Sequence, residues 1–223
     1  IPAAELDDSA YSDCRNKYFK AAGSIRVEGY RDIYNAELLD NPIYLHYTRS
    51  TDGGDYWVYF GESSASYTDQ ILHTDISAPV MTPVQPNDYV STSLNNIMLV
   101  TNGQDTPWYW DGVQGSTLQD LPDWPADTKC GFIRAFKYHA IAGNITEGVN
   151  QYENQLYWSA AVQPGLPPQS WTPLPSNDAG DNILASTPGA LVDACQLRDF
   201  LILAKNHSLY SMTYTGGAYV FRF

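Results

Sequence analysis

The sequence predicts an all-β protein built from irregular blades like those of a β-propeller, with inserted loops. Three observations support this prediction: apolar residues recur at every second position, turn-forming residues separate these runs, and a unit of two strands is repeated four times. Hydrophobic residues make up 43% of the 223 residues and charged residues only 17%, a balance that permits a folded core. We expect the chain to be part of a longer polypeptide, because it lacks an initiator Met and its last residues are strand-like.

Alternation is clearest in two early stretches. Apolar and polar side chains alternate over residues 25–28 and 43–47, as they do on half-buried strands. Residues 52–55 combine Gly with Asp, which is typical of a tight turn. We expect a helical turn only at 2–13 and 35–39, and neither stretch is long enough to form a layer of helices.

The repeated unit consists of an apolar strand, a polar turn and an aromatic strand. Its apolar strands lie at 43–47, 97–100, 138–142 and 200–203, and its aromatic strands at 56–61, 108–112, 156–159 and 208–212. The middle step between apolar strands, from position 97 to position 138, is close to the ~40–45 residues of a four-stranded propeller blade. The steps before and after it are longer, and we attribute the excess to insertions. A β-sandwich with similar hairpins is the alternative.

The chain divides by composition into an end segment and a blade region. Residues 1–40 are expected to form an N-terminal segment with a first strand, and 41–223 to form the blades. Within the blades, residues 162–190 contain six prolines among Ser, Asn and Gly. We interpret this proline-rich stretch as an insertion on the surface.

The net charge of −13 argues against tight binding of nucleic acid. Lys and Arg number 12 against 25 Asp and Glu, and neither Lys nor Arg occurs between Arg49 and Lys129. Proteins that grip phosphates do so with clustered cations.

No motif indicates catalysis or a metal site. The four histidines are widely separated along the chain, and none lies in a zinc-binding or nucleophile context. Two carboxylate pairs, Asp52 with Asp55 and Asp120 with Asp123, have the residue types of a glycosidase dyad, but their Gly, Pro and Trp neighbours indicate surface turns. The Asp52 pair also lacks the ligand spacing of a calcium loop. We therefore expect no enzyme, no cofactor and no metal.

The three cysteines, Cys14, Cys130 and Cys195, are far apart and form no CxxC pair. We expect them to be buried thiols in a reduced compartment, with a single disulfide as the alternative. No apolar run approaches the ~18 residues that a membrane span requires. The sequence therefore predicts no membrane span.

An ordered set of motifs resembles the tail nozzle proteins of short-tailed bacteriophages. Its central part is residues 93–112, in which an Asn102-Gly103 turn precedes Trp108-Tyr109-Trp110 and Asp111-Gly112. The other matching segments follow in the family's order from about residue 20 to the end: 59–61, 75–76, 154–159, Trp171, 197–205, 208–210, 214–217 and 220–221.

The resemblance implies a distorted β-propeller in a virion tail. Identical copies, expected to be six, would form a ring below the portal and the head–tail adaptor, in contact with other tail proteins. This conduit retains genome DNA and then passes it during ejection, without binding it tightly. Assembly would take place in the host cytoplasm.

Acidity fits a conduit of this kind. Six copies would carry six times −13, or −78, and an acidic wall repels phosphates, so DNA meets no deep electrostatic well. For any single carboxylate, the simpler explanation of its presence is that it keeps an exposed β surface soluble.

Five tryptophans are the candidate anchors of ring interfaces or of blade cores, with the blade core favoured for each: Trp108, Trp110, Trp124, Trp158 and Trp171. The alternative function is a carbohydrate-binding phage adhesin or receptor-binding propeller, because exposed Trp and Tyr rings can stack on sugars. A glycan-degrading enzyme is a third and weaker hypothesis.

Overall fold

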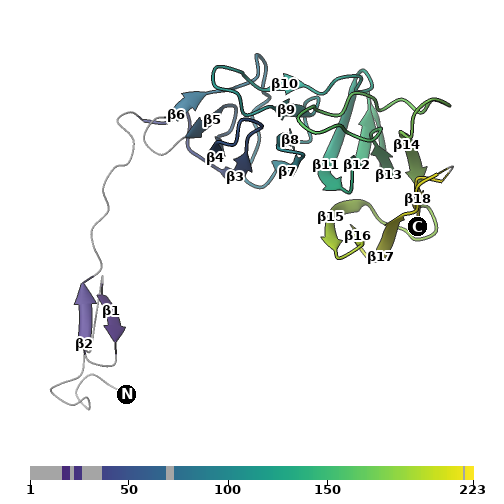
Figure 1. Ribbon diagram of the computed structural model, residues 1–223. Coiled ribbons are helices and arrows are strands. Elements are labelled where there is room, and N and C mark those ends of the chain that lie inside the picture. Colours follow the sequence, from purple (N-terminus) through teal and green to yellow (C-terminus); the bar gives the residue numbers. More distant parts are fainter. Residues whose placement is uncertain (1–16, 21–22, 27–36, 69–72, 218) are drawn as a thin grey trace, which may run out of the picture. The chain divides into compact units, whose positions relative to one another are not determined.

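The computed structural model describes residues 17–20, 23–26, 37–68, 73–217 and 219–223, which contain strands and no helix (Figure 1). The chain divides into two compact units, Ile1–Asn35 and Ala36–Phe223. In the first unit, β1 (Lys17–Lys20) pairs with β2 (Gly23–Arg26) in an antiparallel hairpin. The second unit holds four antiparallel sheets of four strands each. The all-β prediction is therefore confirmed.

Each sheet of the second unit consists of four strands that follow one another along the chain, which is the strand order of a propeller blade. The first sheet comprises β3 (Tyr44–Arg49), β4 (Asp55–Phe60), β5 (Ala65–Thr68) and β6 (His73–Asp75). The second comprises β7 (Val90–Leu94), β8 (Ile97–Thr101), β9 (Trp108–Trp110) and β10 (Gln119–Asp120). The third comprises β11 (Thr128–Phe136), β12 (His139–Glu147), β13 (Asn150–Trp158) and β14 (Gly180–Ile183). The fourth comprises β15 (Leu191–Leu197), β16 (Phe200–Lys205), β17 (Leu209–Tyr214) and β18 (Phe221–Arg222).

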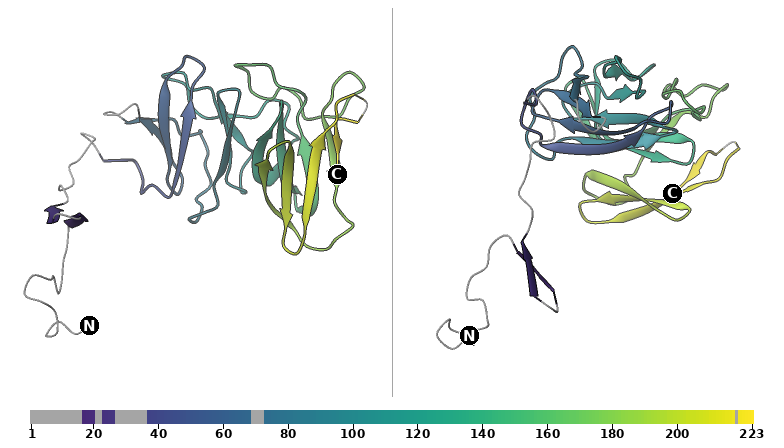
Figure 2. Two further views of the ribbon diagram at one scale, coloured as in Figure 1. Left: turned by 60° about the horizontal axis from the view of Figure 1, so that its bottom comes forward. Right: turned by 60° about the vertical axis from the view of Figure 1, so that its left-hand side comes forward.

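The first strands of successive sheets are neighbours and run in the same direction. Tyr44 bonds Ser91 at 2.9 Å and Thr48 bonds Ser93 at 3.2 Å, so residue numbers rise together along β3 and β7. β11 in turn contacts both β7 and β15. The left view of Figure 2 shows the sheets of this unit following one another from blue to yellow.

Three clusters of buried side chains fill the spaces between successive sheets. The first joins the first and second sheets through residues that include Val58, Phe60, Met98, Trp108 and Trp110. The second joins the second and third sheets, and the third joins the third and fourth. Among the described residues, no cluster joins the fourth sheet to the first. The second unit is therefore a row of blade-like sheets, and it does not close into a propeller.

The structure corrects the alignment of the first repeat. The predicted strands near 97, 138 and 200 are second strands of their sheets, whereas the one near 43 is β3, a first strand. The equivalent second strands begin at Asp55, Ile97, His139 and Phe200, so the first two steps are equal and only the third is longer. The first step therefore contains no insertion.

The misalignment has a physical cause. All five residues of β8 are buried, so this strand has a continuous apolar pattern. Its counterpart β4 alternates between exposed and buried residues, because one face of the first sheet is uncovered. Two equivalent strands thus differ in pattern because they differ in their neighbours.

The longer third step, from His139 to Phe200, contains the proline-rich stretch. Residues 159–179 connect β13 to β14, and β14 itself lies inside the predicted insertion of 162–190. The proline-rich composition therefore predicted a surface insertion over a stretch that also contains the strand β14. Of the two predicted helical turns, 35–39 is not helical over its described residues 37–39, and 2–13 lies outside the described residues. Over the described ranges, no helix is long and apolar enough to cross a membrane.

Candidate functional site

The loops at one end of the row of sheets contain acidic charges only. Strands of a blade alternate in direction, and the first strands run parallel, so connections from second to third strands and from sheet to sheet share one end. We call this the acidic end. Its loops are 61–64, 76–89, 102–107, 121–127, 148–149, 184–190 and 206–208. They include Glu62, Asp88, Asp105, Asp123 and Asp127, and no Lys or Arg.

The opposite end carries both signs of charge. Lys137 and Arg198 lie in its described loops, together with Asp52, Asp111, Asp178 and Asp199. The two ends of the same row therefore present different electrostatic surfaces.

The negative charge is concentrated on the second unit. Residues 36–223 contain 19 Asp and Glu against 7 Lys and Arg, a net charge of −12 out of −13. Among the described residues, three of these seven cations form ion pairs, which join Arg134 to Asp193, Lys137 to Asp199, and Arg49 to Asp55. A fourth, Lys205, is 5% exposed and donates to the backbone oxygens of Leu184 and Thr187. Few cations therefore remain available to a phosphate.

A polar network crosses the first strands of all four sheets. His46 of β3 bonds Ser91 through Nδ1 at 2.8 Å and Ser93 through Nε2 at 3.0 Å. Arg134 of β11 donates to the backbone oxygen of Ser91 at 2.7 Å and to both carboxylate oxygens of Asp193 on β15 at 2.8 Å. Burial, together with the Arg134 charge, lowers the pKa of His46 from 6.5 to about 4, so its ring is neutral at pH 7.

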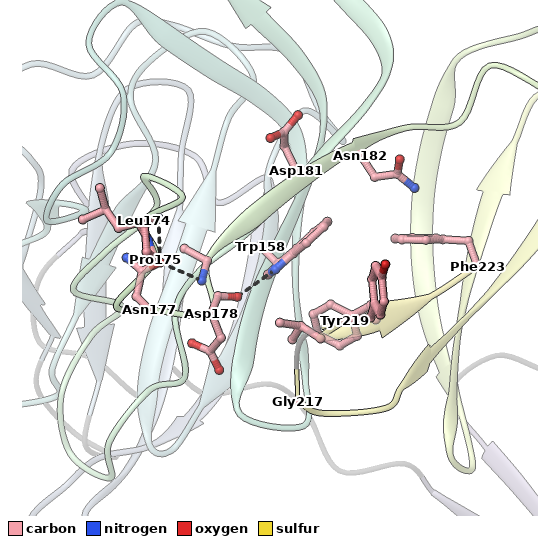
Figure 3. Close-up of a pocket in the computed structure, with 13 residues that line it drawn as sticks. Trp158, Leu174, Pro175, Asn177, Asp178, Asp181, Asn182, Gly217, Tyr219 and Phe223 are labelled. Carbon is pink, nitrogen blue, oxygen red and sulfur yellow. Dashed lines mark hydrogen bonds between the residues drawn. The ribbon is translucent and has the colours of Figure 1, made fainter.

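A pocket of about 610 Å³ lies beside the third sheet, where β14 and the loop before it face the final β17–β18 hairpin (Figure 3). Four aromatic residues line it: Trp158 of β13, Tyr219, Phe221 and Phe223. The polar groups at its wall include Asp178, Asp181 and Asn182. Among the described residues, no Lys, Arg or His lines this pocket.

The five candidate tryptophans occupy different places. Trp108 and Trp110 are buried between the first and second sheets, and Trp124 and Trp171 between the second and third. Trp158 is half-buried at the wall of the pocket. Four of the five thus lie in blade cores, and Trp158 is the one that a ligand can reach.

The Asp52 and Asp55 pair serves the β3–β4 turn. Asp52 accepts hydrogen bonds from the Ser50 hydroxyl and from the Gly54 amide, and the Ser50 bond is the main cause that lowers the pKa of Asp52. Asp55 accepts a bond from the Tyr47 hydroxyl at 2.7 Å. Both carboxylates therefore have local partners.

Asp120 and Asp123 also have different roles and do not act as a pair. Asp120 is exposed on β10, whereas Asp123 accepts bonds from the Ser170 hydroxyl at 3.1 Å and the Trp171 amide at 3.2 Å. Asp123 therefore holds the proline-rich connection to the loop that follows the second sheet. In the part of the chain that the structure describes, no three His, Cys, Asp or Glu side chains converge as metal ligands.

The cysteine expectation holds for one residue and fails for another. Cys130 is buried, and desolvation raises the pKa of its thiol to about 12. Cys195 is exposed on β15, because its side chain faces the uncovered side of the fourth sheet. Cys14 lies outside the described residues. Both described thiols are free.

Sequence reasoning missed the network and the pocket. His46, Arg134 and Asp193 lie on different sheets, and no local motif joins them. Tyr219 and Phe223 stand out in the sequence only as parts of a final strand-like run. Trp57, 48% exposed on the first sheet, is also absent from the candidates.

The chain matches no protein-family model, and no similar curated protein is found. The row of blades, the acidic end and the pocket are the features that bear on function.

Proposed function

We propose that the chain is a structural component of a bacteriophage tail, part of a ring-shaped nozzle that retains genome DNA and passes it during ejection. The acidic end is the observation that supports this most directly. A surface that DNA must pass without binding requires negative charge and few free cations, and the loops of the acidic end meet both conditions. The ordered motifs that resemble nozzle proteins support the same function.

Contacts between copies in such a ring require surface that the row of sheets leaves uncovered. The first sheet exposes Tyr47 and Trp57, whose rings meet edge to face at 5.3 Å. The fourth sheet exposes Leu197, Phe200 and Leu209. These side chains supply apolar area for assembly with identical copies, which we propose to be six, and with the head–tail adaptor.

The electrostatic effect of the acidic end acts over a short distance. At an ionic strength of 0.1 M the Debye length is about 10 Å, so its carboxylates act only on DNA that passes close by. The proposal therefore predicts an effect that depends on which end of the row is altered.

The first test adds positive charge to the acidic end. Gln85, Gln104 and Val149 are exposed residues of its loops, and Val149 is 97% exposed. We expect the triple variant Gln85→Lys, Gln104→Lys, Val149→Lys to assemble normally in the phage that encodes the chain. Its DNA ejection, followed by fluorescence of released DNA, should be slowed or stalled, because the added cations attract phosphates.

A matched control adds the same three charges to the opposite end. Thr51, Gln114 and Gln163 are exposed residues of loops at that end. Their triple replacement by Lys should leave ejection close to the wild-type rate. Equal behaviour of the two variants would refute the electrostatic role of the acidic end. Electron microscopy that locates the chain at the periphery of the particle, away from the portal axis, would refute the nozzle itself.

A further inference from the structure

The pocket beside Trp158 presents an aromatic surface that is held in place from behind. The indole Nε1 donates to the backbone oxygen of Asp178 at 2.9 Å. The edge of the ring meets Phe221, with centroids 5.5 Å apart at 83°. Gly180 lies against the ring, and a Cβ there would come within 2.4 Å of Cζ2. Only glycine at this position lets Trp158 keep its place.

Two further rings extend this surface. Tyr219 is 83% exposed and Phe223 is 38% exposed, although aromatic rings are usually buried. The centroids of Trp158 and Phe223 are 6.3 Å apart with planes at 42°, a spacing at which rings touch each other. Trp158 and Phe223 therefore form a continuous aromatic platform at the wall of the pocket, and Tyr219 adds a third ring to the lining. In the view of Figure 3 the Tyr219 ring lies below these two rings, with its hydroxyl end toward them.

Hydrogen-bonding groups with spare capacity surround this platform. Asp178 is oriented by the Ala161 amide, which donates to Oδ1 at 2.8 Å, while Oδ2 lies 3.7 Å from Nε2 of His139. Asp181 lies on the opposite face of β14 from Asn182, where it accepts a bond of 3.4 Å from Gln155, and its carboxylate points away from the rings (Figure 3). Within the described residues, the Asn182 amide nitrogen has no hydrogen-bond partner. The site thus offers the Asp178 carboxylate as an acceptor and the Asn182 amide as a donor to a ligand.

His139 fixes the wall behind Asp178. Its ring is fully buried, and Nδ1 lies 2.8 Å from the backbone oxygen of Ser159, so Nδ1 is the donor. Nε2 has no hydrogen-bond partner in the described part of the chain, and it faces the Asp178 carboxylate. The wall of the pocket is therefore polar in two layers: the half-exposed Asp178 carboxylate, and behind it the buried Nε2 of His139, which has no hydrogen-bond partner among the described residues.

The charge of the pocket selects among ligands. Two carboxylates and no cation line it, which disfavours phosphates, uronic acids and other anions. Hydroxyl groups, in contrast, donate strong hydrogen bonds to carboxylates. A pyranose ring has an apolar CH face that fits an aromatic platform and a rim of hydroxyls that fits Asp and Asn. The volume of about 610 Å³ is in the range of small-molecule sites.

We propose that this pocket binds neutral pyranose units of a polysaccharide. Trp158, Tyr219 and Phe223 contact the apolar face of the sugar, Asp178 accepts a hydroxyl hydrogen, and the Asn182 amide donates to a hydroxyl oxygen. This binding activity does not depend on the nozzle proposal, and either can fail without the other.

The test is a titration of the isolated chain with glucose, galactose, mannose and N-acetylglucosamine, by calorimetry and saturation-transfer NMR. We expect saturable binding of at least one of these sugars, with a Kd in the millimolar range that is usual for ligands of this size. Glucuronate and choline are titrated in parallel as an anionic and a cationic comparison, and both should bind at least tenfold more weakly.

Two variants locate the binding. Tyr219→Ser removes a ring that is almost fully exposed, and Asp178→Asn keeps the size of the side chain while removing its charge. Each should weaken the affinity at least fivefold with little change in melting temperature. The matched control is Tyr138→Ser, which removes a ring that is 59% exposed outside the pocket and should leave binding unchanged.

Three results would overturn the proposal. The first is no binding of any of the four neutral sugars. The second is binding that Tyr219→Ser and Asp178→Asn leave intact, which would place the sugar elsewhere. The third is tighter binding of choline or glucuronate than of every neutral sugar, which would assign the pocket to a charged ligand.

Discussion

Arg134 of the third sheet holds Asp193 of the fourth through two hydrogen bonds, each 2.8 Å long. The same guanidinium donates to the backbone oxygen of Ser91 in the second sheet at 2.7 Å. One side chain therefore links three successive sheets, and its planar fork suits the carboxylate. Apolar clusters fill the spaces between the sheets, and this contact sets how their first strands are aligned.

Replacing Arg134 by Lys should loosen this link. Lysine keeps the charge but cannot donate in the same forked geometry. Both partners are partly exposed, at 26% and 44%, so we expect the free energy of unfolding to fall by only about 1–2 kcal/mol in urea denaturation. Lys137→Gln removes a pair in which Asp199 is 85% exposed, and it should cost under about 0.5 kcal/mol. Equal losses in the two variants would contradict a special role for Arg134.

His46 should make the fold sensitive to mild acid. Its pKa is about 4 in the folded chain and 6.5 ordinarily, so the unfolded chain binds the proton more readily. The contribution of neutral His46 is complete above pH 6.5 and is lost as the pH falls towards 4, by at most about 3 kcal/mol. Urea midpoints measured from pH 7 to 4 should therefore decline more steeply in the wild type than in His46→Gln.

The control for this pH dependence is His207→Gln. His207 is exposed in the β16–β17 loop, and its removal should leave the slope of stability against pH unchanged. Parallel profiles of wild type and His46→Gln would show that His46 is not the group responsible.

Gly112 should tolerate no side chain. Its φ of +76° is in the left-handed region, and a Cβ would come within 2.2 Å of the Cβ of Ser50. Gly115 has a similar φ of +85°, but a Cβ added there would meet nothing within 4 Å. Gly115→Ala should cost about 1–2 kcal/mol for backbone strain alone. Gly112→Ala should cost a further ~1–3 kcal/mol from overpacking between the first two sheets, which thermal denaturation can measure. Equal costs would mean that Ser50 moves aside freely.

Trp171 should anchor the proline-rich connection. Its ring packs on Trp124 with centroids 4.6 Å apart, and it is buried. Trp171→Ala should lower stability by about 3–5 kcal/mol and speed cleavage of residues 159–179 by thermolysin. Trp171→Phe should cost under about 1.5 kcal/mol, because the indole Nε1 has no hydrogen-bond partner among the described residues. Rapid cleavage of Trp171→Phe as well would show that the contact requires the full indole.

Local pattern was enough to predict the strands and the blade-like repeat. Alternation and turn residues such as Asn102-Gly103 are properties of neighbouring positions, and they act before distant parts of the chain meet. The prediction failed where burial depends on neighbours in space. β4 and β8 are equivalent strands with different patterns of buried and exposed residues. β14 lies within the proline-rich stretch, which was predicted to be a surface insertion.

The amino-acid sequence was enough to establish the all-β class, the excess of acidic over basic residues and the small number of Lys and Arg. The positions of those charges follow from the folded structure, because strand direction assigns each loop to one end of the row and so creates the acidic end. The same holds for the link from His46 through Ser91 to Arg134 and Asp193, and for the aromatic lining of Trp158, Tyr219 and Phe223. Their members lie far apart along the chain or show no periodic spacing, and they meet because successive blades place their first strands side by side and fold the last hairpin against β14.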